Sequence, residues 1–320
     1  MVLIAGPNLT IDRTLGIDEL RPGEVLRFRS AAITPGGKGV NVARVARTLG
    51  VRAVLVGFVP GHTGAAAVKM LGDERIDVRT VPVAGEVRST SIILEQSGRV
   101  TVLNEPGPQI TDRDWATYES LIEREVGGHR ALVCTGSVPP GAPSDAYGRL
   151  VAIGREAGVL TLVDAAGPLL RGALAAGPTV VTPNLSEAER LLDRESPDGV
   201  TLPVDEARER SMDAAARLVE LGAELAVVTA GAAGLALAGD GGSRWLAAPN
   251  VAPRNPVGAG DSLVGGFVAA VEQGMDRADA VLFGAATAAA SVEQALAGGI
   301  DPRRARDLAS YLEWAGRPRR

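Results

Sequence analysis

Six apolar, β-rich segments recur along the chain, and helical patterns separate them. Continuous apolar runs of this length are typical of strands that are covered on both faces. Helices between successive strands imply crossover connections, and therefore a mainly parallel, doubly wound α/β sheet with helices on both sides. The predicted strands are residues 2–6, 52–59, 130–136, 160–165, 179–184 and 225–231.

Two segments depart from this alternation. Residues 10–34 and 87–104 alternate polar with apolar side chains, as half-exposed strands do. They could form a small secondary sheet over one edge of the main layer, although two ordinary surface hairpins would give the same pattern. From residue 258 onward a helical pattern rich in small residues indicates close helix packing, with a ligand pocket as the alternative. Residues 194–206 are predicted to be a loop and 315–320 a frayed tail.

Composition excludes several classes of protein. A length of 320 residues allows one large α/β domain or two small ones. The single Cys134 excludes a disulfide framework and fits a reducing cytosol. The first residues lack the basic segment of a signal peptide, and no run of about 18 apolar residues could span a membrane. The net charge of −5 argues against a general nucleic-acid binder. We therefore expect a soluble cytoplasmic protein that acts on a small molecule.

A glycine-rich turn at residues 34–50, TPGGKGVNVARVARTLG, leads into a helical pattern. Such a turn presents free backbone N–H groups and the positive end of the helix dipole, which together bind anions. Lys38 adds a full charge, and only it and Lys69 are lysines among the 33 basic residues. The turn is not a P-loop, because Gly39 follows Lys38 where a P-loop has Ser or Thr.

A second turn, NPVGAGDSLVGG, repeats the arrangement. Gly258, Ala259 and Gly260 come before a helical repeat, and Asp261 falls in its first turn. Although an Asp there can be a simple helix cap, the backbone amides beside it would stabilise a transferring phosphoryl group. Two such turns indicate two bound anions. A nicotinamide dehydrogenase is disfavoured, because Leu263 stands where the third glycine of Gly-x-Gly-x-x-Gly would be.

The same string offers two catalytic residues, Asp261 and Ser262. A GDSL-type esterase would use Ser262 as nucleophile with a histidine base, but the only histidines, His62 and His129, lie far upstream. Phosphoryl transfer asks mainly for positioning, charge neutralisation and a group that accepts the proton of the attacking hydroxyl. Asp261 can accept that proton, so the sequence favours a kinase over an esterase.

The two turns resemble the signature segments of PfkB-type, ribokinase-like sugar kinases, here as PGGKGVNVARVA and VGAGDSLVGGFVAA. The linking segments NLTIDRT, GSVPPG, TPNLSEAE and TAGAAG follow in the family's order. Among the branches the chain looks most like the 1-phosphofructokinase and tagatose-6-phosphate kinase group, whose first loop also reads Gly-Gly-Lys-Gly. The resemblance implies a three-layer α/β/α fold, a single kinase domain over residues 1–320, and a small β lid formed by about 10–34 and 87–104.

The resemblance also implies roles for matching residues. Asp261 would be the catalytic base, and the amides of Gly258, Ala259 and Gly260 would form the anion hole. Lys38 and Arg88 would hold the phosphate that the sugar already carries. Asp12 and Ser137 could instead be turn residues, and Arg88 a solvated strand residue. The implied substrate-binding residues are Asp12, Gly37, Lys38, Asn41, Arg88, Ser137 and Arg27.

For the nucleotide, the resemblance implies ATP and Mg²⁺. Asn184 and Glu187 would position the metal and the ATP phosphates through water, since Mg²⁺ loses its hydration shell reluctantly. Glu187 could instead be an ordinary helix-start carboxylate. Thr229, Gly231 and Gly234 would approach the nucleotide. Thr182 stands where the family often has Lys, which would weaken the hold on the ATP phosphates.

The expected activity is ATP-dependent phosphorylation of a phosphorylated ketohexose, with fructose 1-phosphate going to fructose 1,6-bisphosphate as the first choice. Tagatose 6-phosphate and fructose 6-phosphate are alternative acceptors, because Lys38 and Arg88 recognise a phosphate without fixing which carbon bears it. A non-catalytic sugar-phosphate sensor is the alternative from a different class. The resemblance implies that the small sheet covers the sugar and forms a homodimer contact, as it often does in the family. The apolar side chains of Ile92, Leu94 and Val102 could instead pack entirely against their own domain.

Overall fold

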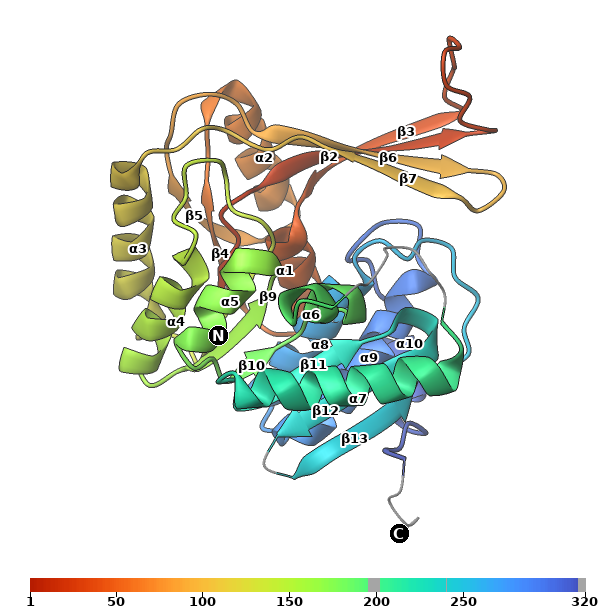
Figure 1. Ribbon diagram of the computed structural model, residues 1–320. Coiled ribbons are helices and arrows are strands. Elements are labelled where there is room, and N and C mark those ends of the chain that lie inside the picture. Colours follow the sequence, from red (N-terminus) through yellow and green to blue (C-terminus); the bar gives the residue numbers. More distant parts are fainter. Residues whose placement is uncertain (195–201, 240, 316–320) are drawn as a thin grey trace.

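The computed structural model describes residues 1–194, 202–239 and 241–315. Within them, nine strands form the main sheet: β1 (Val2–Ala5), β4 (Ala53–Phe58), β5 (Asp77–Val81), β8 (Ala131–Thr135), β9 (Leu160–Asp164), β10 (Val180–Val181), β11 (Leu225–Thr229), β12 (Gly234–Gly239) and β13 (Gly242–Ala247). Their order is β13-β12-β11-β10-β9-β8-β1-β4-β5 (Figure 1). All neighbours from β5 to β11 pair in parallel, and β12 and β13 add an antiparallel edge.

Each of the six apolar segments forms a strand, which confirms the predicted mainly parallel sheet. The sequence did not predict the strands at the two edges. Outer strands are exposed along one side, so β5 and β13 mix exposed with buried residues and lack the continuous apolar run of a central strand.

Helices cover both faces of the sheet, as expected for a doubly wound fold. The side chains of β1 alternate between the two faces: Leu3 and Ala5 join one core cluster, and Val2 and Ile4 join the other. The first cluster packs under α3 (Asp112–Val126), α4 (Ala146–Glu156), α5 (Gly167–Ala175), α6 (Leu185–Leu191) and α7 (Val204–Glu220). The second packs under α1 (Lys38–Thr48), α2 (Gly61–Asp73), α8 (Ala259–Glu272) and α9 (Arg277–Val292), with α10 (Pro302–Ala309) packed on α9.

Small residues allow α8 to approach its neighbours closely. A Cβ added to Gly265 would lie 2.7 Å from the side chain of Val45 on α1. A Cβ on Gly266 would lie 2.5 Å from Thr287 Oγ1 and 3.1 Å from the Cα of Gly284 on α9. The small-residue pattern therefore reflects close helix packing.

The two half-exposed segments pair with each other in a second sheet. It consists of β2 (Thr10–Ile17), β3 (Ser30–Gly36), β6 (Arg88–Glu95) and β7 (Val100–Asn104), in the order β3-β2-β6-β7. The central pair, β2 and β6, is parallel, whereas a hairpin pairs antiparallel strands. This small sheet projects from the main body as an arm (Figure 1).

The ends of two predicted segments lie outside the described residues. Residues 195–201 belong to the predicted loop and 316–320 to the predicted tail. At the far end of that loop, α7 already begins at Val204, immediately after Pro203, so the predicted loop extends too far there. A membrane-spanning helix would need greater length and apolar character than any helix in the described part of the chain has.

Candidate active site

A cavity of about 990 Å³ lies between the small sheet and the carboxyl ends of the main-sheet strands. Its lining includes Gly6 after β1, Thr135 at the end of β8 and Thr229 at the end of β11. Open α/β sheets bind ligands at this edge. From the small sheet come Asp12 and Thr90, which lie directly opposite each other on β2 and β6 and so share one face.

Most of the residues singled out from the sequence line this cavity: Asp12, Gly37, Lys38, Asn41, Arg88, Ser137, Asn184, Glu187, Thr229, Gly258, Ala259, Gly260 and Asp261. Three lie elsewhere. Arg27 is exposed in the connection between β2 and β3, and Gly231 is exposed in a short 3₁₀ helix, Gly231–Ala233. Gly234 begins β12, where an added Cβ would lie 2.2 Å from the carbonyl oxygen of Leu246, so packing requires a glycine there.

Both glycine turns lead into helices that lack a side-chain cap. α1 follows Gly37 (φ 101°) and α8 follows Gly258 (φ 84°), in the left-handed region that favours glycine. Among the described residues, the N–H groups of Lys38 and Gly39 on α1, and those of Gly260 and Asp261 on α8, have no hydrogen-bond acceptor. Both turns line the cavity, which therefore contains two helix starts suited to anions.

Asp261 is 5% exposed, and its Oδ2 accepts a 2.8 Å hydrogen bond from Asn41 Nδ2. Burial raises its pKa to about 6, and the nearby carboxylates of Asp164 and Asp12 act in the same direction. Lys38 and the Asn41 amide oppose this shift. A carboxylate whose pKa lies near neutrality is ionised at pH 7 and suited to accept a proton.

Arg44 fixes the orientation of Asn41. Its Nη1 donates to Asn41 Oδ1 at 3.1 Å, so the Asn41 amide must turn its Nδ2 toward Asp261. Arg44 is itself held by Glu74, which accepts from Nε at 2.7 Å and from Nη2 at 2.9 Å. A chain of hydrogen bonds thus runs from Glu74 through Arg44 and Asn41 to Asp261.

Lys38 lies in an acidic corner of the cavity. Its Nζ is 3.1 Å from Asp164 Oδ2, and the same oxygen accepts from Thr135 Oγ1 at 3.0 Å. Burial opposes the charge of Lys38, but Asp164, Asp261 and Glu187 outweigh it and raise the pKa of the ammonium. Lys38 is therefore surrounded by carboxylates, on the side of the cavity that holds Glu187.

Arg88 and Asp12 form a second charged group. Arg88 donates to the backbone carbonyls of Asn8 and Glu105, each at 3.3 Å, and no carboxylate of the described residues is its hydrogen-bond partner. Burial lowers the pKa of its guanidinium, although Asp12 and Glu105 oppose the shift. Asp12 is 8% exposed, and its Oδ1 has no hydrogen-bond partner among the described residues. Burial raises the pKa of Asp12.

Asn184 and Glu187 form a capping box at the start of α6. Asn184 Oδ1 accepts from the Glu187 N–H, and Glu187 Oε2 accepts from the Asn184 N–H, both at 2.9 Å. Both residues also line the cavity, so the capping interpretation of Glu187 is correct without excluding a role toward a ligand. Nearby, the hydroxyl of the buried Thr182 has no hydrogen-bond partner in the described part of the chain.

The donor set fits Mg²⁺ that keeps most of its water. No three His, Cys, Asp or Glu side chains within the described residues gather closely enough to bind a metal by themselves. Glu187 lines the cavity, and the carboxylate of Asp164 is near enough to act on the pKa of Glu187. One or two carboxylates together with substrate phosphates are the usual protein environment of Mg²⁺.

Ser262 has a structural position. It is fully buried within α8, and its hydroxyl donates to the carbonyl oxygen of Gly258 at 2.8 Å. His129 Nδ1 is bonded to the carbonyl oxygen of Glu125 at the end of α3, and His62 lies on the surface at the start of α2. Among the described residues no serine–histidine pair forms, which disfavours the esterase.

Sequence reasoning missed three polar residues of this site. Asp164 is the last residue of β9, and its place at the end of an apolar run could have revealed it. Asn8, which donates to Ser137 Oγ at 3.0 Å, lies in the quoted NLTIDRT segment. Arg44 gave no local signal, because its helical position resembles that of an ordinary surface arginine.

A doubly wound sheet, two anion-binding helix starts and a buried carboxylate beside them are the features of a ribokinase-like sugar kinase. The chain belongs to the pfkB family of carbohydrate kinases, whose family model matches residues 8–303.

Solved structures agree with this assignment. Phosphofructokinase-2 from Escherichia coli, in complex with potassium, is 26% identical with a TM-score of 0.87, over 97% of this chain and 98% of that chain. A possible 1-phosphofructokinase from Thermotoga maritima is 26% identical with a TM-score of 0.85, over 98% of both chains. Ribokinase from Arabidopsis thaliana, complexed with ribose and ATP, shares the fold at 20% identity and a TM-score of 0.74, over 97% of this chain and 98% of that chain.

Proposed function

We propose that this sugar kinase transfers the γ-phosphoryl group of ATP to a ketohexose that already carries a phosphate. Fructose 1-phosphate is the proposed acceptor, and the product is fructose 1,6-bisphosphate. The Gly-Gly-Lys-Gly turn, shared with the 1-phosphofructokinase group, supports this choice. Fructose 6-phosphate and tagatose 6-phosphate are alternatives, since a phosphate-binding arginine does not select the carbon that bears the phosphate.

Arg88 carries the argument for a phosphorylated acceptor. Its guanidinium lines the cavity, and its hydrogen bonds go to backbone carbonyls that leave its charge without an ion pair among the described residues. Arginine presents a fork of donors that matches a phosphate group. Beside it, the unpartnered Oδ1 of Asp12 would accept a hydrogen bond from a sugar hydroxyl.

Asp261 would accept the proton of the attacking hydroxyl. Asp12, Lys38 and Asp164 all act on its pKa, so Asp261 lies within electrostatic reach of both charged groups. The N–H groups at the start of α8 would stabilise the negative charge of the transferring phosphoryl group.

In this proposal Lys38 binds the transferred phosphoryl group. Its contact with Asp164 and its proximity to Glu187 favour the nucleotide side over the sugar's own phosphate. ATP would supply the phosphoryl group, and Mg²⁺ would neutralise its charge. Asp164 and Glu187 would hold the metal, mainly through water.

The small sheet is proposed to close over the sugar and to form the contact of a homodimer. One of its faces lines the cavity through Asp12, Thr90 and Ile92. Closure over the acceptor would exclude water, which otherwise competes for the phosphoryl group.

The test is a coupled assay of ADP release with ATP and Mg²⁺. It compares fructose 1-phosphate, fructose 6-phosphate, tagatose 6-phosphate and unphosphorylated fructose. We expect a phosphorylated ketohexose to give the highest kcat/KM. Loss of one charge-assisted contact in Arg88→Gln should raise the KM for it by about tenfold or more, with little change for fructose.

Arg13→Gln is the matched control, because Arg13 lies on the neighbouring strand β2 and outside the cavity lining. A preference for unphosphorylated fructose, or an Arg88→Gln enzyme with unchanged KM, would refute the phosphate contact.

A further inference from the structure

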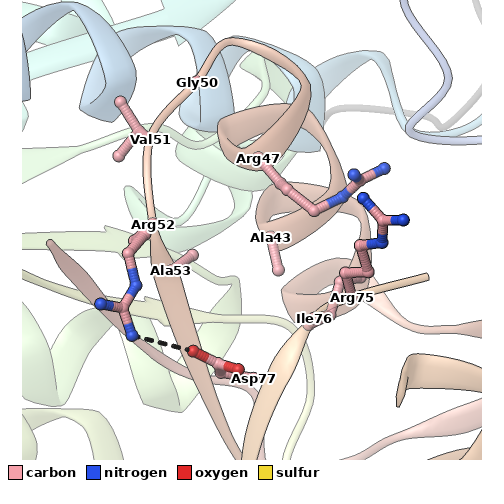
Figure 2. Close-up of a pocket in the computed structure, with 9 residues that line it drawn as sticks. All are labelled: Ala43, Arg47, Gly50, Val51, Arg52, Ala53, Arg75, Ile76 and Asp77. Carbon is pink, nitrogen blue, oxygen red and sulfur yellow. Dashed lines mark hydrogen bonds and ion pairs between the residues drawn. The ribbon is translucent and has the colours of Figure 1, made fainter. Parts of the chain in front are cut away.

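A second cavity, of about 450 Å³, lies at the opposite end of α1 from the candidate active site. It is bounded by the C-terminal ends of α1 and α2 and by the starts of β4 and β5 (Figure 2). Asn41 on α1 lines the first cavity, whereas Ala43 and Arg47, further along the same helix, line the second. They share no lining residue.

Charge is unbalanced in this cavity. Its lining includes Arg47, Arg52, Arg75 and Asp77, three positive charges and one negative, which leave a net charge of +2. Arg52 Nη2 pairs with Asp77 Oδ2 at 3.3 Å. The guanidinium groups of Arg47 and Arg75 are turned toward each other (Figure 2). Within the described residues neither side chain forms a hydrogen bond or an ion pair, so two like charges face one another without a counterion.

Arg75 occupies a backbone position that favours glycine. α1 and α2 end in the same way, with a backbone hydrogen bond from an apolar residue to the last turn of the helix. The N–H of Val51 donates to the carbonyl oxygen of Ala46, and the N–H of Ile76 donates to that of Leu71, both at 2.9 Å. The residue before each of these donors has a left-handed backbone conformation. After α1 this residue is Gly50, with φ 84°. After α2 it is Arg75, with φ 57°. This conformation costs conformational free energy for any residue with a side chain.

Helix ends explain part of this arrangement. A cation near a helix C-terminus is favourable, so each arginine could be placed by the dipole of its own helix. The dipoles do not explain why both guanidinium groups converge on one cavity. The dipole of α2 also does not require an arginine in the left-handed position of Arg75, since an arginine one turn earlier would interact with the dipole equally well.

We propose that this cavity binds a small organic phosphate with two negative charges. The phosphate lies between Arg47 and Arg75, whose donor forks match its oxygen atoms. The apolar part of the ligand packs against Ala43, Val51 and Ile76, which line the cavity. A volume of about 450 Å³ is in the range of small-molecule sites.

Isothermal titration calorimetry with phenyl phosphate tests the proposal. The full chain is used in an Arg88→Gln background, which removes the arginine proposed to bind a phosphate at the candidate active site. Arg75→Gly and Arg47→Gln should each weaken binding by about tenfold or more, the effect of losing a charge-assisted contact. Arg217→Gln is the matched control, since Arg217 is an exposed arginine paired with Glu220 on α7.

Arg75→Gly separates binding from folding. Glycine relieves the left-handed backbone, so this variant should unfold at the same temperature as the parent or higher while losing affinity. Unchanged affinity in both arginine variants would overturn the site, as would an equal loss in Arg217→Gln. Tighter binding of malonate than of phenyl phosphate would overturn the assignment to a phosphate.

Discussion

At the scale of single residues, the proposed role of Asp261 as the catalytic base depends on how its carboxylate is held. Burial raises its pKa, and two partners limit that shift: the amide of Asn41 and the charge of Lys38. The Asn41 amide is oriented by Arg44, and Arg44 by Glu74. Geometry and proton affinity at Asp261 are therefore set together by side chains from α1 and the end of α2.

Substituting Asp261 and Ser262 separately should distinguish their roles. Asp261→Asn removes the proton acceptor and should lower kcat by about 10²–10⁴-fold, while ATP binding is largely retained. Ser262→Ala removes only a hydrogen bond to the carbonyl oxygen of Gly258 and should cost much less activity. ADP release and calorimetric ATP binding measure both effects. A serine variant that is the more damaged of the two would contradict the assignment.

The pH dependence should follow Asp261. Its ionised form is the proposed base, so kcat/KM should fall about tenfold per pH unit below the pKa of about 6 and level off above it. An ordinary Asp has a value near 3.8, which would leave the rate constant down to about pH 4. Initial rates between pH 4.5 and 8 distinguish the two cases.

Arg44 should act as a positioning residue. In Arg44→Met the Asn41 amide is no longer fixed and Asp261 loses a reliable donor, so its pKa rises. We expect kcat/KM at pH 7 to fall by about tenfold, within the range seen when an orienting partner is lost. The acid limb of the pH profile should move to higher pH. Lys69→Met, a surface change on α2, is the control, and a lower rate with an unmoved acid limb would indicate a merely structural role.

At the scale of elements, two helix starts are the candidate anion sites. Each begins at a glycine with positive φ and has no side-chain cap, so its first amides are left for a ligand. There is also little space for a side chain at the start of α8, because a Cβ on Gly258 would lie 3.2 Å from Ala297 Cβ and 3.4 Å from Asn41 Nδ2.

Gly258→Ala should therefore damage catalysis more than stability. A left-handed alanine costs about 1–2 kcal/mol wherever it occurs, but here the displaced amides also lose the transferring phosphoryl group. The matched control is Gly274→Ala after α8, with φ 89° and no atom within 4 Å of the added Cβ. Gly258→Ala should lose at least as much thermal stability as Gly274→Ala, because only its added Cβ meets close neighbours, and only Gly258→Ala should lose about tenfold or more in kcat. Equal kcat in the two variants would argue against the anion hole.

At the scale of the whole molecule, the small sheet has two different faces. Pairing places Ile33, Arg13, Ser91 and Leu103 in one row across its four strands. The cavity-facing residues Asp12 and Thr90 occupy the next row. Because successive residues of a strand point to opposite faces, Ile33 and Leu103 lie on the side away from the cavity, and each is 57% exposed.

Leu103→Asp should break the proposed dimer. Replacing this exposed apolar side chain with a carboxylate would bury a charge in the proposed interface, so the protein should elute as a monomer in size-exclusion chromatography with light scattering. Leu221→Asp is the control, because Leu221 is 47% exposed just after α7 and lies outside the small sheet. A wild-type monomer, or an unchanged dimer in Leu103→Asp, would contradict the proposed contact.

Much of the fold could be predicted from local patterns. Buried runs revealed the six central parallel strands, and alternation revealed the two segments of the small sheet. The edge strands β5, β12 and β13 were missed, because exposure and small residues weaken their signal. In the site, the glycine turns could be recognised, because their glycines and the helical pattern that follows lie next to each other in the sequence. Asp164 and Arg44 were not, because their roles depend on partners far away in the sequence.

The sequence by itself determined the strand and helix pattern and the place of Asp261 in the first turn of α8, because periodicity and turn chemistry act over a few residues. Only the tertiary structure decided which distant groups meet. β1 lies between β4 and β8, and this crossing order carries Lys38 to Asp164 and Asn41 to Asp261. It places Lys38 near Asp164 and Glu187, and Arg88 near Asp12. No local pattern contains that information, since contacts between distant residues follow from the way that the layers pack.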